Sequence, residues 1–243
     1  MTTRRKPLRN SEPYSGLSDV TEQRRREIQA IFRVELEFTD DCLALMATLV
    51  EALGHCTPND SRDVSVRDLG CDAFEFLYAA KEALLENKPS LAFPLIRRAF
   101  ESTSLSQVFI HNKQFAEKWA KGGRIQNAEV RKQLEKGPFA DPAAEIRETY
   151  GHYSRGTHAN RTHIPFTFLG EGNKFTLGSI FPIDELTLGG HIRHLMQQAY
   201  WLIGVFVFHY HIVAKSLGHN YEEAVLELTP RIEQLGRKLT RKH

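Results

Sequence analysis

The densest run of chemically active side chains in this chain lies between Tyr150 and Asn160, Tyr-Gly-His-Tyr-Ser-Arg-Gly-Thr-His-Ala-Asn. If the run is helical, Tyr150, Ser154 and His158 are spaced i, i+4 and i+8 and form one polar stripe. An imidazole changes its charge near neutral pH and can accept or deliver a proton. The run therefore predicts acid–base chemistry.

A second polar pair, Arg97 and Glu101, is spaced i, i+4 in the segment 90–110. The Glu101 carboxylate can accept from an imidazole N–H and fix its tautomer, and the Arg97 guanidinium can bind a phosphate through two hydrogen bonds. We expect these two residues to meet Ser154 and His158 and to act on a phosphodiester without a metal. The alternative is a buried polar network that only fixes the register of the helices.

The two segments LIRRAFES (95–102) and YSRGTHAN (153–160) resemble a group of uncharacterised bacterial HEPN-like helical proteins. In that group, a helix with an Arg and a following Glu is paired with a later Ser…His segment. The resemblance in plan covers roughly residues 20–240. HEPN domains are typically dimeric, and many are metal-independent ribonucleases of toxin–antitoxin, CRISPR-associated and anti-phage systems. Their motif, an Arg and then a His after four to six residues, fits Arg147–His152 and Arg237–His243.

The resemblance implies a cytoplasmic RNA-cleaving or RNA-binding effector that needs no cofactor. His158 or His152 would move the proton of a ribose 2′-OH or of the leaving oxygen, and Arg97, Arg147 or Arg155 would stabilise phosphate charge. The expected partners are a second copy of the chain in a homodimer, RNA or a nucleotide, and a cognate antitoxin or operon partner; no membrane is expected. The expected catalytic residues are His158, His152, Arg147, Arg97, Glu101 and Ser154, and the expected RNA- or nucleotide-binding residues are Arg98, Tyr150, Arg155, Asn160 and Arg161.

Two other functions remain open at this point. The same polar residues could form a non-catalytic module that binds a nucleotide or a partner peptide. The chain could also be a peripheral membrane or scaffold protein that uses the helix at 195–213. Its most apolar stretch, Trp201–Val213, is about 13 residues long and too short to span a bilayer, so we expect a buried core helix there.

The sequence contains none of the motifs GxxxxGK[ST], GxGxxG after a strand, HExxH, paired CxxC or GxSxG, which removes the commonest nucleotide, zinc and serine-hydrolase classes. His191 and His194 are three residues apart on a predicted helix, with Glu185 about two turns earlier, and could hold a divalent metal. Chance pairing on a half-buried face is the simpler explanation, so no metal site is predicted.

Composition places the chain among ordinary globular proteins, because 41% of its 243 residues are hydrophobic and 26% are charged. The three cysteines, Cys42, Cys56 and Cys71, form no CxxC and predict free thiols in a reducing compartment. Residues 1–26 and 231–243 each carry a net charge of +4, so the residues between them carry −6. Such basic ends either contact RNA or an acidic partner, or are solvated and aid solubility.

The elements that must position these residues can be read from apolar spacing and from Pro and Gly. We expect an all-α, HEPN-like helical bundle in one domain over 18–240, preceded by a disordered basic arm over 1–17. The alternating residues around Gly170–Asn173 predict a β-hairpin insertion at 164–181. The expected helices cover 19–53 with a capping box at Asp19–Glu22, 65–87, 90–110 with Pro94 in its first turn, 113–121, 124–134, a stretch from about 141, 184–217 and 221–239.

Overall fold

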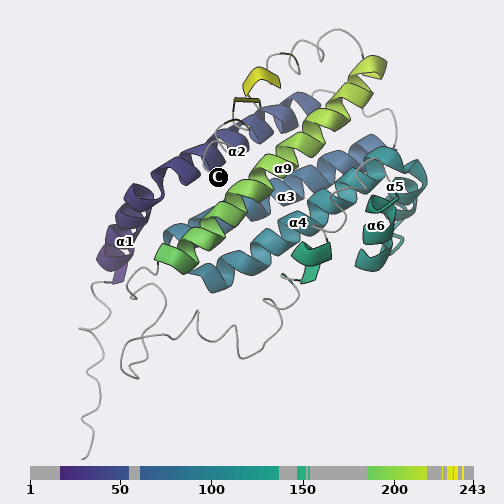
Figure 1. Ribbon diagram of the computed structural model, residues 1–243. Coiled ribbons are helices and arrows are strands. Elements are labelled where there is room, and N and C mark those ends of the chain that lie inside the picture. Colours follow the sequence, from purple (N-terminus) through teal and green to yellow (C-terminus); the bar gives the residue numbers. More distant parts are fainter. Residues whose placement is uncertain are drawn as a thin grey trace, which may run out of the picture.

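Seven helices of the computed structural model have defined bounds (Figure 1). The model describes residues 17–54, 61–136, 147–151, 153 and 185–217, together with residues 226, 229–231, 233, 234 and 237. The helices are α1 (Leu17–Ile31), α2 (Arg33–Gly54), α3 (Ser61–Leu85), α4 (Pro89–His111), α5 (Lys113–Ala120), α6 (Asn127–Leu134) and α9 (Glu185–Leu217).

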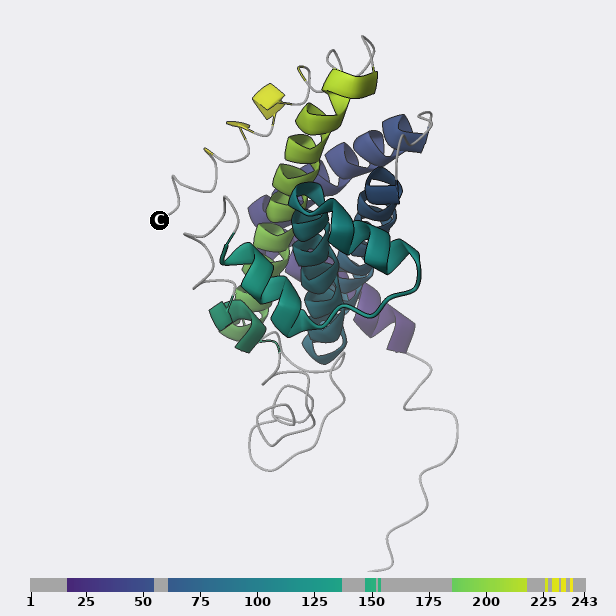
Figure 2. The ribbon, with the colours of Figure 1, turned by 90° about the vertical axis from the view of Figure 1, so that its right-hand side faces the viewer.

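The four long helices α2, α3, α4 and α9 lie side by side and form the body of the molecule (Figure 1). Helix α3 packs along α4, and α9 contacts α2, α3 and α4. Helix α1 extends from one end of this body, whereas α5 and α6 pack at the opposite end (Figures 1 and 2). Helix α4 therefore contacts both α6 and α9.

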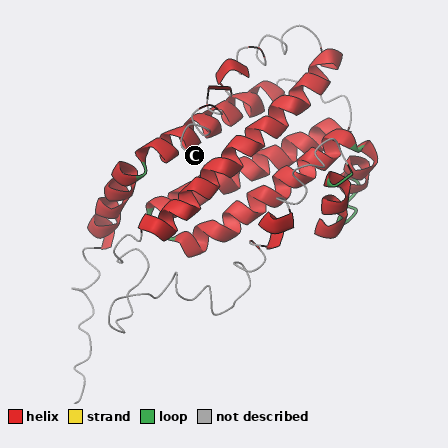
Figure 3. Ribbon diagram, in the orientation of Figure 1, coloured by secondary structure: helices red, strands yellow, loops and turns green. Residues whose placement is uncertain are grey.

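The described residues are helical or lie in short connections and contain no strand (Figure 3). The all-α prediction is confirmed for this part of the chain. The hairpin predicted at 164–181 and arm residues 1–16 lie outside the described residues. In the regions of the two remaining predicted helices, the described residues are helical: 147–151 and 153 in the first, and 226, 229–231, 233, 234 and 237 in the second.

Helix α9 supplies much of the core through residues spaced three or four apart. This stripe is at most 2% exposed and consists of Leu188, Ile192, Leu195, Ala199, Leu202 and Phe206. A fully buried Leu, Ile or Phe side chain stabilises the fold by about 1.5–3 kcal/mol. The stretch that begins at Trp201 is therefore part of a core helix, as far as its residues are described. No helix in the described ranges is long and apolar enough to cross a membrane.

Helices α3 and α9 approach closely at Gly70. A Cβ atom at this position would lie 1.6 Å from Cζ of Phe206, a ring that is fully buried. Two non-bonded carbon atoms cannot lie that close together. The Phe206 ring therefore occupies the space that the side chain of any residue larger than glycine would need at position 70. The glycine thus sets the spacing between the two helices.

The single helix predicted for 19–53 is wrong, because α1 and α2 are separated by a turn at Phe32. The Phe32 side chain is 7% exposed and reaches α9, where a Cβ on Gly189 would lie 2.9 Å from its ring. Arg25 of α1 binds Glu82 of α3 at 2.8 Å. These contacts join residues far apart in sequence, so local spacing could not predict the break. The capping box was also wrong, because Asp19 lies inside α1.

The starts of α4 and α6 also differ from the prediction. Helix α4 begins at Pro89, where a proline fits because that amide has no helical partner, so Pro94 lies inside the helix and not in its first turn. Helix α6 begins at Asn127, three residues later than predicted. The cause is a capping box, in which the Gln126 backbone N–H donates to the Glu129 carboxylate at 2.8 Å.

Candidate functional site

The two polar residues predicted on α4 bind each other. Arg97 donates from Nε to Oε1 of Glu101 at 3.0 Å, and their side chains are 23% and 19% exposed. The same Glu101 oxygen accepts from Nδ2 of Asn127 at the start of α6, at 3.1 Å. The pair therefore connects α4 to α6 and remains open to solvent on one side.

Tyr150 lies against this pair from the helical residues 147–151. Its ring meets Phe100 edge-on, with centroids 4.7 Å apart, and the Arg131 guanidinium lies 5.2 Å from its centroid. Burial raises the pKa of Tyr150 to about 12, and Glu101 adds to this increase, whereas Ser104, Arg131 and Arg97 lower it. All of these groups therefore lie near the phenol. We call Arg97, Glu101, Ser104, Asn127, Arg131 and Tyr150 the polar cluster.

The buried side of the polar cluster has unused hydrogen-bonding capacity. The Ser104 hydroxyl is close enough to Tyr150 to lower its pKa. Even so, neither hydroxyl has a partner that satisfies hydrogen-bond geometry among the described residues. Because buried polar atoms are usually paired, this interior is more polar than packing alone requires.

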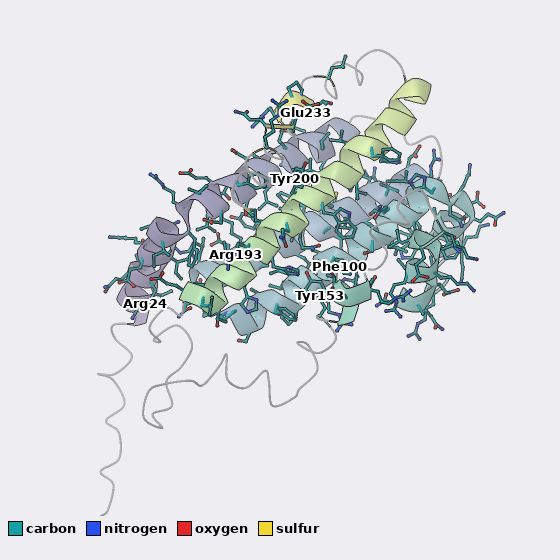
Figure 4. The ribbon with its side chains drawn as sticks, viewed as in Figure 1. Arg24, Phe100, Tyr153, Arg193, Tyr200 and Glu233 are labelled. Atoms are coloured by element: carbon teal, nitrogen blue, oxygen red, sulfur yellow. The ribbon has the colours of Figure 1, made fainter. Side chains whose placement is uncertain are left out.

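Tyr153 anchors the same segment to two long helices. Its fully buried ring lies 5.3 Å from Phe93 and 5.1 Å from Phe100 of α4, and its hydroxyl forms a hydrogen bond with Nε2 of His194 on α9. Figure 4 shows Tyr153 beside Phe100. Phe100 is one residue from Glu101, so the described start of the chemistry-rich run rests against the polar cluster.

The structure brings Arg97, Glu101 and Tyr150 together but places two other candidates elsewhere. The Arg98 guanidinium lies 5.8 Å from the Phe76 ring centroid and 3.6 Å from Asp72, both on α3. Arg147 is exposed and forms an ion pair with Glu135, beyond the end of α6. The remaining candidates lie outside the described residues: His152, Ser154, Arg155, His158, Asn160 and Arg161.

Two histidines of α9, His191 and His194, make aromatic and polar contacts. The His191 ring meets Phe93 edge-on at 5.7 Å, and His194 binds Tyr153. Within the described ranges, no group of three His, Cys, Asp or Glu side chains could hold a metal ion.

Sequence reasoning missed three members of the polar cluster. Ser104 follows Glu101 by one helical turn, so extending the α4 spacing would have found it. Asn127 and Arg131 belong to a short helix whose packing has no local signal. Reasoning also missed a buried pair between α3 and α9, in which Nε2 of His209 lies 3.7 Å from a carboxylate oxygen of Asp63.

Comparison of the chain with protein-family models, curated proteins and solved structures found no match. Its function must therefore be argued from its own residues.

Proposed function

We propose that this chain is a cytoplasmic, HEPN-like RNA-binding protein that cleaves RNA at the polar cluster of α4 without a metal. A homodimer and a cognate antitoxin or operon partner belong to the same proposal.

The packing of two tyrosine rings on Phe100 carries the proposal. Tyr150 and Tyr153 both pack on this residue, at 4.7 and 5.1 Å between ring centroids. They hold the first described part of the Tyr150–Asn160 run against the helix that carries Arg97 and Glu101. Two segments that are about fifty residues apart in sequence thus share one face of the bundle, which a site built from both of them requires.

The cluster offers the charge that phosphate binding needs. Arg97 and Arg131 supply two guanidinium groups beside one carboxylate, Glu101. Guanidinium groups bind phosphate oxygens through charge-assisted hydrogen bonds and are worth most where water is partly excluded. Arg97 and Glu101 are partly exposed, so solvent reaches both groups.

In the reaction, His158 or His152 takes the proton from a ribose 2′-OH. The 2′-oxygen then attacks phosphorus, the bond from phosphorus to the 5′-oxygen breaks, and that oxygen receives a proton. Arg97 stabilises the added negative charge on the phosphate oxygens. The products are a 2′,3′-cyclic phosphate and a free 5′-hydroxyl, and DNA is not a substrate because it lacks the 2′-OH.

The test is to incubate the purified protein with total RNA in EDTA. We expect cleavage by the wild-type protein, and loss of cleavage in His158→Ala or His152→Ala. The catalytic proposal is wrong if the wild-type protein does not cleave RNA. It is also wrong if both variants cleave RNA as fast as the wild type does.

A matched pair of variants tests the role of α4. Arg97→Ala should lower kcat/KM by about 10²-fold, the usual effect of removing one group that stabilises developing charge. Arg33→Ala is the control, because Arg33 and Glu37 form an i, i+4 pair on α2, far from the cluster. Equal effects of the two substitutions would show that Arg97 has no special role.

A second candidate function is binding without turnover. It is favoured by the engagement of Oε1 of Glu101 with both Arg97 and Asn127, which makes the carboxylate part of a fixed network. On this alternative, a nucleotide raises the melting temperature of the wild-type protein but not of Arg97→Ala, and no product forms.

A further inference from the structure

The positive side chains of the first four helices are all paired with acids. In residues 17–54 and 61–112, each Lys or Arg has a Glu or Asp oxygen within 4.0 Å. These residues are Arg24, Arg25, Arg26, Arg33, Arg62, Arg67, Lys81, Lys88, Arg97 and Arg98. These four helices therefore have almost no unbalanced positive charge.

The segment 113–136, which contains α5 and α6, is different; we call it the basic hairpin. It has seven basic and three acidic residues, a net charge of +4. Lys118 is paired with Glu129 at 3.6 Å. Five other cations have no carboxylate within ion-pair distance in the described part of the chain: Lys121, Arg124, Arg131, Lys132 and Lys136.

These cations gather at one end of the molecule. The basic hairpin packs at the end of the bundle opposite α1, and Figure 4 shows its side chains extending into solvent there. Unpaired like charges repel each other, and the repulsion is weak only beyond a Debye length of about 8 Å at physiological salt. A cluster of cations that no described carboxylate neutralises creates a positive potential that attracts a polyanion.

The hairpin fits a nucleic acid better than a membrane. A helix that lies on a lipid surface needs an exposed apolar face of Trp, Phe or Leu. The large apolar side chains that are exposed in the described ranges all lie outside 113–136. Phe115 and Trp119 instead pack on the core, with the Trp119 ring 5.8 Å from Phe109.

Arg131 connects the hairpin to the polar cluster. It belongs to α6, and its guanidinium lies over the Tyr150 ring. Arg131 would thus place a cation between a phosphate at the cluster and phosphates along the hairpin. We infer that the basic hairpin is the surface that binds the RNA strand next to the phosphate held at the cluster, an inference that rests on the proposed function.

The experiment measures binding of a fluorescent, uridine-rich single-stranded RNA by anisotropy at several salt concentrations. The test variant is Lys132→Gln/Lys136→Gln, which removes two unpaired, exposed cations. The control is Arg26→Gln/Arg33→Gln, which removes two exposed cations that are paired on α1 and α2. Binding to phosphatidylcholine–phosphatidylserine vesicles and to polyglutamate is measured in parallel.

Each lost phosphate contact reduces the slope of log K against log salt by about 0.7 for single-stranded RNA. The test variant should therefore lose about 1.4 in slope and roughly 25-fold in affinity near 0.1 M salt, while the control keeps both. If the wild type binds RNA and both variants bind it equally well, the hairpin is not the RNA surface although the proposed function stands. If the wild type binds no RNA, or binds only vesicles or polyglutamate, both proposals fail.

Discussion

Replacement of Gly70 by alanine tests how closely α3 and α9 pack. The new Cβ would lie 1.6, 2.3 and 2.6 Å from three ring atoms of Phe206. The ring is fully buried, so it cannot turn into solvent, and it must move by about 2 Å to reach ordinary contact distance. Overpacking of this kind costs about 1–3 kcal/mol.

Alanine also has a favourable effect that must be subtracted. In the interior of a helix it is about 1 kcal/mol better than glycine. Because the overlap with the Phe206 ring is severe, we take the overpacking cost at about 3 kcal/mol, the upper end of its range. Subtracting the gain in helix propensity leaves a net loss of about 2 kcal/mol of unfolding free energy. For a chain of this size, that loss lowers the melting temperature by roughly 4–8 °C.

The control is Gly204→Ala on α9, where an added Cβ meets no atom within 4 Å. This substitution should raise the melting temperature by roughly 2–4 °C, because only the gain in helix propensity applies. The assay is thermal unfolding followed by circular dichroism, and Phe206→Leu should recover part of the loss in Gly70→Ala. If Gly70→Ala is as stable as Gly204→Ala, the described packing of α3 against α9 is wrong.

Three further predictions concern buried groups. Tyr153→Phe should lose about 1–2 kcal/mol of unfolding free energy in urea, because it removes the hydrogen bond to His194; an unchanged midpoint would refute that role. The pKa of Tyr150 is raised to about 12 in the fold, so the neutral phenol stabilises the protein below pH 10, and roughly 3 kcal/mol of that stability is lost as the pH rises towards 12; Tyr150→Phe should therefore flatten the fall in stability over that range. Cys42 is buried with its pKa raised to about 12, so peptide mapping after an iodoacetamide pulse should find it unlabelled in buffer and labelled in urea.

Local sequence signals were sufficient for the helices α3 and α4. Their apolar residues recur at helical spacing, and the break between them ends at Lys88, directly before Pro89. Asn87 just before Lys88 has a φ of 56°, a left-handed conformation that asparagine tolerates better than most residues. The predicted bounds 65–87 and 90–110 are therefore within a few residues of Ser61–Leu85 and Pro89–His111.

The break at Phe32 could not be predicted, because it depends on contacts with α3 and α9. Helix α6 presents the same difficulty, since Asn127 and Arg131 reach the polar cluster only through tertiary packing. The separation of Arg98 from Arg97 is different. Successive helical residues point about 100° apart, so the sequence itself indicated that the two guanidinium groups would not share a face.

Photo-crosslinking with a 4-thiouridine RNA tests the central claim most directly, because it identifies which residues touch the bound strand. The RNA is bound to the full-length protein and irradiated, and the crosslinked peptides are identified by mass spectrometry. We predict crosslinks within residues 95–102 and 147–161, accompanied by crosslinks in 113–136. Crosslinks confined to α1, α2 or the two basic ends would contradict an RNA site on α4.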